Sequence, residues 1–157
     1  MEWTALVATF VGASIAMGSA VLVEIRKDRR ETSTEWRLGK RELYGTYLAK
    51  LAQVRSDLQL TVLDRSLSAA ERTVVSRQTF AGCYELRYQL EVFAPASVVE
   101  PAVTYFRAVR KLRDATAAGM EDGDEECERV FREVMDTLAG VRAAMRLDMG
   151  TDKLATG

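Results

Sequence analysis

The densest group of side chains that could do chemistry is an acidic segment in the last third of the chain. It places six carboxylates within eight positions, namely Glu121, Asp122, Asp124, Glu125, Glu126 and Glu128. Carboxylate oxygens are the ligands that hard divalent cations prefer. The spacing is not that of an EF-hand loop, and acidic residues also favour a helix N-terminus because they complement its dipole. We therefore predict the start of a helix here, with no metal site.

A basic stretch made by Arg107, Arg110, Lys111 and Arg113 offers a second kind of chemistry, the binding of a phosphate group or an anionic lipid. A solvated helix face explains the stretch more simply. The chain has a net charge of −1, and no aromatic residues alternate with the basic ones as a base-stacking surface would require. We therefore predict no nucleic-acid partner.

Three tyrosines, Tyr84, Tyr88 and Tyr105, could line a pocket. Tyrosines at helical spacing are more often the edge of an apolar core, with the hydroxyl in water. The sequence favours this second interpretation.

Catalytic chemistry has little support elsewhere in the chain. There is no histidine, which removes the usual acid–base group and histidine-based metal sites. Cys83 and Cys127 are far apart and form no CxxC pair, so they are predicted to be small core residues. Phosphate loops, nucleophile elbows and dinucleotide fingerprints are missing from the sequence. We predict a protein that is not an enzyme, with no catalytic residue and no cofactor.

The most informative segment is the 21-residue run from Trp3 to Val23, which contains no charged residue. A helix of roughly 20 apolar residues spans a bilayer. A cleavable signal peptide would begin with basic residues, which this chain lacks, although small residues near the end of the run leave a cleavage site open. A buried helix without charge on any face is a weaker alternative. We therefore predict a single-pass membrane anchor.

Two features of this anchor carry the predicted functional residues. Four basic residues follow the run, and the positive-inside rule then places the N-terminus outside and the rest of the chain in the cytoplasm, at the plasma (inner) membrane. The same residues could contact anionic headgroups; they are Arg26, Lys27, Arg29 and Arg30. Small residues recur every fourth position within the run and form a ridge suited to close helix packing in lipid. The ridge consists of Ala8, Gly12, Ala16 and Ala20.

Beyond the anchor, apolar residues recur at helical spacing throughout. Four helices are predicted, over residues 32–63, 68–93, 97–119 and 124–150. Ser68 with Glu71, and Ser97 with Glu100, have the spacing of capping boxes, and Gly119 and Gly150 are natural helix ends. In the second helix, Tyr84, Tyr88 and Val92 widen the apolar stripe, which predicts contacts on two sides.

The predicted fold is all-α: an N-terminal transmembrane helix followed by an antiparallel up-down-up-down four-helix bundle. The first bundle helix has a pattern that would allow it to continue the membrane helix as one rod. The predicted organisation is a transmembrane anchor (1–25), a basic juxtamembrane segment (26–34), a cytoplasmic helical bundle (35–150) and a flexible tail (151–157).

Short motifs at both ends of the chain add a resemblance. Trp3 opens the spanning run, an arginine-rich exit follows, Arg41 and Tyr44 lie close together, and the segment 144–150 reads Ala-Met-Arg-Leu-Asp-Met-Gly. This layout resembles short single-pass actinobacterial membrane proteins of unknown function that have a cytoplasmic helical domain. The resemblance implies topology and a helical fold, and it implies no activity.

Together these features predict a non-enzymatic scaffold or interaction module. Its expected partners are membrane lipid, a second copy or another membrane helix, and a cytoplasmic protein. The first alternative is a membrane-permeabilising effector of a toxin or phage-defence type, whose bundle senses a signal. The second alternative is a ligand or metal sensor.

Overall fold

The computed structural model describes residues 35–151, and all of its regular structure in that range is helical. The predicted membrane helix and the basic segment therefore lie outside the described residues. Among residues 35–151, no helix is both long and apolar enough to cross a membrane. The chain divides into two compact units, Met1–Gly39 and Lys40–Gly157. In the first unit, the described residues 35–39 are helical. The second unit is the bundle described below.

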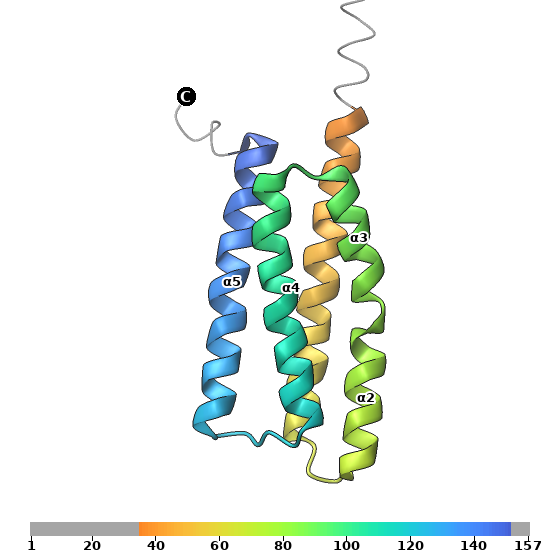
Figure 1. The fold of residues 1–157 in the computed structure, drawn as a ribbon, viewed down its shortest axis with the longest axis vertical. Helices are drawn as coiled ribbons and strands as arrows, with labels where there is room; N and C mark the ends of the chain where they lie inside the picture. Colours follow the sequence, from red (N-terminus) through yellow and green to blue (C-terminus); the bar gives the residue numbers. More distant parts are fainter. Residues whose placement is uncertain (1–34, 152–157) are drawn as a thin grey trace, which may run out of the picture. The chain divides into compact units, whose positions relative to one another are not determined.

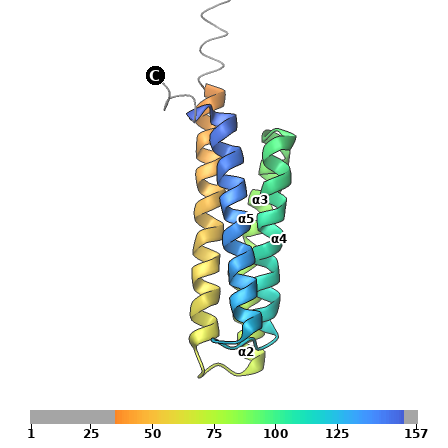
Figure 2. The same cartoon turned by 90° about the vertical axis from the view of Figure 1, so that its left-hand side faces the viewer.

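The bundle consists of four antiparallel rods, as the sequence predicts (Figure 1). The first rod is a helix that runs through residues 35–63, here called the first helix. The second rod is made of two shorter helices, α2 (Ala69–Ala81) and α3 (Cys83–Phe93), placed end to end. The third and fourth rods are α4 (Ala96–Ala117) and α5 (Glu125–Met149). Figure 2 shows the first helix beside α5 along much of their length.

Apolar residues at steps of three and four form one core between these rods. The first helix contributes Tyr47, Leu51, Val54 and Leu58, all fully buried. Opposite them lie residues of α4 and α5 that the sequence pattern also predicts. These are Val98, Ala102, Tyr105, Val109 and Leu112 on α4, and Cys127, Val130, Val134, Val141 and Met145 on α5. The periodic stripes on these three helices are therefore confirmed.

The second rod differs from the prediction of one helix over 68–93, because Gly82 separates α2 from α3. Glycine has low helix propensity and allows neighbouring groups to approach its backbone closely. A Cβ atom at Gly82 would lie 3.4 Å from Cε of Lys50, so the lysine stem of the first helix passes against this break. The predicted second contact side of this rod is also missing within the described chain, since Tyr88 and Val92 are exposed.

Helix ends follow the sequence in most places. Ser68 and Glu71 form the predicted capping box at the start of α2. Gly119 and Gly150 have positive φ and follow the ends of α4 and α5, as predicted. The predicted box of Ser97 with Glu100 is wrong, because α4 already begins at Ala96 and Ser97 lies inside the helix.

We call the end of the bundle where α3 and α5 finish and α4 begins the proximal end. The first helix enters the bundle at this end with Lys40. The opposite end, which contains the connections 64–68 and 118–124, is the distal end (Figure 1).

Candidate functional site

A polar cluster at the proximal end joins the start of the bundle to its last helix. The ammonium Nζ of Lys40 lies 3.0 Å from Oδ2 of Asp148, and the hydroxyl of Tyr44 donates a 2.8 Å hydrogen bond to the same oxygen. The side chains of Lys40 and Asp148 are only 17% and 15% exposed, and Tyr44 is buried. The shielded carboxylate of Asp148 therefore accepts hydrogen bonds from two residues of the first helix, which lie far from it in the sequence.

Local sequence explains this geometry. Lys40 and Tyr44 are four residues apart, so they lie on one face of the first helix. Asp148 lies in the last turn of α5, which is antiparallel and finishes at the same level. Gly150 then ends α5 in the left-handed conformation, with φ of 69°. Its amide bonds back to the carbonyls of Arg146 and Leu147, which closes the last turn that carries Asp148.

The contacts of this cluster favour the protonated form of Tyr44. Burial raises the pKa of the Tyr44 hydroxyl, and the hydrogen bond from this hydroxyl to Asp148 raises it further. Tyr44 therefore remains a hydrogen-bond donor at neutral pH. The Tyr44 hydroxyl and the Lys40 ammonium both donate hydrogen bonds to the same carboxylate, so the cluster links the first helix to α5.

This contact also joins two of the four short motifs that carry the resemblance to other membrane proteins. Tyr44 belongs to the first segment and Asp148 to the second. Within the C-terminal segment, Met145 is a core residue, Asp148 binds the first helix, and Gly150 is the helix stop. The fold thus gives these residues structural roles. Sequence reasoning did not pair Lys40 with Asp148, although their positions at the two ends of an antiparallel bundle could have suggested it.

The predicted basic stretch on α4 does not form a single patch. Arg107 and Arg110 are exposed, whereas Lys111 turns toward α5. Arg113 turns the other way, where its guanidinium lies over the ring of Phe80 and approaches the Tyr84 hydroxyl at 3.4 Å. A single anion-binding surface on this stretch is therefore not what the fold builds.

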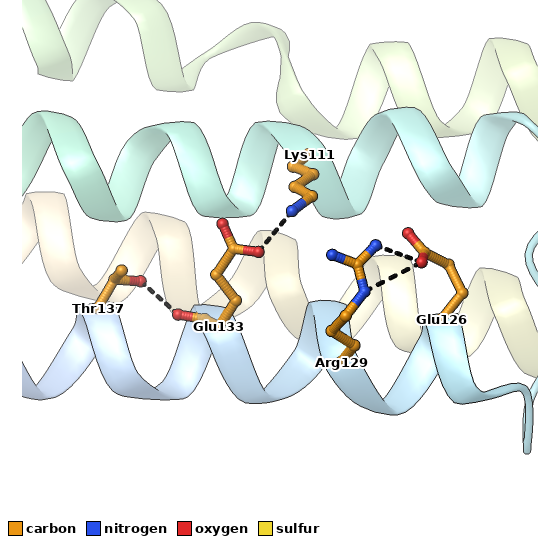
Figure 3. Close-up of polar contacts among 5 residues, drawn as sticks. All are labelled: Lys111, Glu126, Arg129, Glu133 and Thr137. Atoms are coloured by element: carbon orange, nitrogen blue, oxygen red, sulfur yellow. Dashed lines mark hydrogen bonds and ion pairs between the residues drawn. The ribbon is translucent and has the colours of Figure 1, made fainter.

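Figure 3 shows polar contacts of α4 and α5, some between partly buried residues and some between exposed ones. Lys111 forms a 2.6 Å ion pair with Glu133, between helices that are adjacent in the core. Glu126, at the start of α5, pairs with Arg129 one turn later, and this contact lowers the pKa of the glutamate. The first contact therefore joins α4 to α5, and the second lies within α5.

The acidic segment begins α5, as predicted. All six carboxylates are exposed, and α5 starts at Glu125. Across residues 35–151, no three acidic or cysteine side chains come close enough together to hold a metal ion. The segment therefore lies where a helix dipole favours acids.

The three candidate tyrosines do not share a pocket. Tyr88 is exposed and Tyr84 is half-buried, with its ring against Phe80 and Phe106. Tyr105 is fully buried, and its hydroxyl makes no hydrogen bond to any described residue. The interpretation that their hydroxyls lie in water is therefore wrong for Tyr105.

Both cysteines are buried free thiols, as predicted. Burial raises the pKa of Cys83 to about 11 and also raises that of Cys127. Because the thiolate is the reactive form, the raised pKa values favour the less reactive, protonated form of both thiols at neutral pH.

The predicted membrane-helix ridge (Ala8, Gly12, Ala16, Ala20) and the topology residues (Arg26, Lys27, Arg29, Arg30) lie outside the described residues. No family model matches the chain, and neither curated proteins nor solved structures give a significant match.

Proposed function

We propose that the protein is a non-enzymatic, membrane-anchored scaffold whose helical bundle presents a surface to other proteins. The observation that carries this proposal is the uncharged run over residues 3–23, which is separated from Lys40 by 16 residues. A run of this length matches the thickness of a bilayer. The four basic residues at 26–30 support a cytoplasmic bundle at the plasma membrane. The resemblance to single-pass actinobacterial membrane proteins supports the same topology.

The shielded polar cluster and the buried thiols of the bundle are used within it. Its shielded polar groups, Lys40, Tyr44 and Asp148, bind one another and tie two helices together. Its buried thiols have raised pKa values. The surfaces of the bundle are therefore the features available to a partner.

Membrane attachment is tested by flotation of the full chain with vesicles after an alkaline carbonate wash. A spanning protein stays with the lipid, and a surface-bound one is released. Protease added outside sealed inverted vesicles should then digest the bundle if it is cytoplasmic. Release of the protein by carbonate would contradict the anchor, and a protected bundle would contradict the orientation.

Self-association through the membrane helix is the more specific part of the proposal. Small residues at Ala8, Gly12, Ala16 and Ala20 would allow two helix backbones to approach closely. Gly12→Leu should lower the oligomer number measured by mass photometry in detergent, with helicity unchanged. Phe10→Leu is the matched control, because position 10 lies on the opposite side of an ideal helix. An unchanged oligomer in Gly12→Leu would contradict a role of the ridge in self-association.

A further inference from the structure

Two strongly exposed apolar side chains lie at the proximal end of the bundle. Val92, in the last turn of α3, is 74% exposed, and Leu147, in the last turn of α5, is 68% exposed. In the view of Figure 1 the start of α4 lies between the end of α3 and the end of α5. The connection into α4, residues 94–95, contains no charged residue, and the first two residues of α4, Ala96 and Ser97, are exposed.

Exposed apolar residues alone do not distinguish the two ends, since Leu63 near the distal end is 50% exposed. Charge does distinguish them. The proximal segments 40–44, 91–100 and 142–151 contain four basic and four acidic residues. The distal segments 63–72 and 118–129 contain three basic and eight acidic residues. An anionic surface would therefore repel the distal end and tolerate the proximal end.

The chain also enters the bundle at the proximal end. Only the 16 residues 24–39 separate the uncharged run from Lys40. Residues 35–39 are helical, so the connection spans at most about 3.6 Å for each of residues 24–34 and about 1.5 Å for each of residues 35–39, roughly 47 Å in all. Such a tether keeps the proximal end at high effective concentration near the membrane, where a weak contact becomes populated.

We propose that the proximal end of the bundle docks on the lipid headgroup surface, with Val92 and Leu147 inserted at the interface. Tyr88 lies one turn before Val92 and extends the same apolar face of α3. Exposed apolar side chains beside a neutral surface suit the boundary between headgroups and acyl chains. This inference rests on the proposed membrane anchor and adds a fixed orientation of the bundle, with its acidic end directed away from the bilayer.

The test uses the full chain in nanodiscs that contain phosphatidylglycerol, with a fluorophore at Ser97→Cys or, as the distal probe, at Ser66→Cys. The native thiols are buried and should react slowly. A nitroxide on the lipid headgroup should quench the proximal probe several-fold more than the distal one. The double variant Val92→Asp with Leu147→Asp should bring proximal quenching down toward the distal value.

The matched control is Leu63→Asp with Val74→Asp, which adds the same charge at exposed positions far from the proximal end. This control should leave proximal quenching unchanged. Thermal unfolding checks that both double variants fold. Equal quenching of the two probes, or quenching that Val92→Asp with Leu147→Asp does not reduce, would overturn the docking.

Two other outcomes identify what is wrong. If proximal probes on different molecules show energy transfer and no quenching, a second copy covers this end and lipid docking is overturned. If the wild-type chain fails to float with vesicles after carbonate, the anchor and the docking both fail. Flotation without quenching overturns the docking alone.

Discussion

The two ends of the bundle are held together by different kinds of contact. At the proximal end, Lys40 and Tyr44 share the shielded carboxylate of Asp148, a contact that joins residues more than one hundred positions apart. At the distal end, Ser68 and Glu71 form a local capping box. Arg72 adds two longer bonds, of 3.4 Å each, to the carbonyls of Met120 and Asp64.

The difference shows where a local change will have global consequences. The proximal contact links the first helix to the last, so it acts on the closure of the whole bundle. The distal contacts hold the start of α2 and join it to the connections on either side of the distal end. We therefore expect the proximal end to control the free energy of unfolding, and the distal end to set only the local order of α2.

The largest effect should come from Asp148→Ala. This substitution leaves the poorly exposed ammonium of Lys40 and the hydroxyl of Tyr44 without their acceptor. Removing one partner of a shielded charged contact costs about 3 kcal/mol. Urea unfolding of the full chain would measure the loss. Asp136→Ala, an exposed acid on the same helix, is the control and should cost less than about 0.5 kcal/mol. A loss below about 1 kcal/mol in Asp148→Ala would show that the cluster does not hold the bundle closed.

Alkaline pH should lower the free energy of unfolding of the bundle through the ionisation of its buried tyrosines. The folded-state pKa of Tyr44 lies above its ordinary value of 10.0, as do those of the buried Tyr47 and Tyr105. Below pH 10 the tyrosines are neutral in both states, so their contribution to stability is fully present. Above pH 10 the unfolded chain loses these protons first, and stability falls with pH.

Each such tyrosine should remove about 1.4 kcal/mol per pH unit above this point. In Tyr44→Phe, the free energy of unfolding should therefore fall less steeply with pH, by the contribution of one tyrosine. Urea midpoints at pH 9 and pH 11 would measure the difference. Tyr88→Phe is the control, because Tyr88 is exposed and should leave the slope nearly unchanged. Equal slopes for Tyr44→Phe and the wild type would contradict the protected hydroxyl.

At the distal end, Ser68→Ala should have a smaller and more local effect. The substitution removes the side chain that caps the amide of Glu71, and losing an N-cap costs about 1 kcal/mol. Hydrogen exchange should speed up in the first turn of α2 and remain unchanged near Asp148. The exposed Ser56→Ala on the first helix is a control for the serine-to-alanine change. Faster exchange throughout the bundle would show that the distal end is as important to closure as the proximal one.

Sequence periodicity is sufficient to predict which helix faces of this fold are buried. The stripes of the first helix, α4 and α5 follow from apolar spacing, because each helix must bury one face. The stops at Gly119 and Gly150 follow from the positive φ that glycine adopts without strain. These features are local, so one segment at a time is enough to predict them.

The missed features depend on two segments at once. The break at Gly82 involves Lys50 from another helix, and a single glycine in a helical pattern does not require a break. The pairing of Lys40 with Asp148 requires the register between the first helix and α5, which periodicity does not specify. For the same reason the basic stretch of α4 looked like one surface, whereas Lys111 and Arg113 turn to different neighbours.

The smallest effect should come from the ion pair of Lys111 with Glu133, which lies between α4 and α5. It resembles the proximal pair in chemistry and is even shorter, at 2.6 Å. Its side chains, however, are 42% and 41% exposed, so water screens the charges in both the folded and the unfolded state. Exposed pairs of this kind contribute about 0.5 kcal/mol. Lys111→Gln should therefore shift the urea midpoint only slightly, and the shift should shrink further at high salt.

The matched measurement is Lys40→Gln, which removes the lysine of the proximal pair by the same change of side chain. Its shift should be several times larger and less sensitive to salt, because Asp148 is shielded and, among the described residues, would keep the Tyr44 hydroxyl as its donor. If the two variants lose equal stability, solvent exposure does not set the difference between these pairs. The proximal end would then owe its strength to the core beneath it, and not to the cluster.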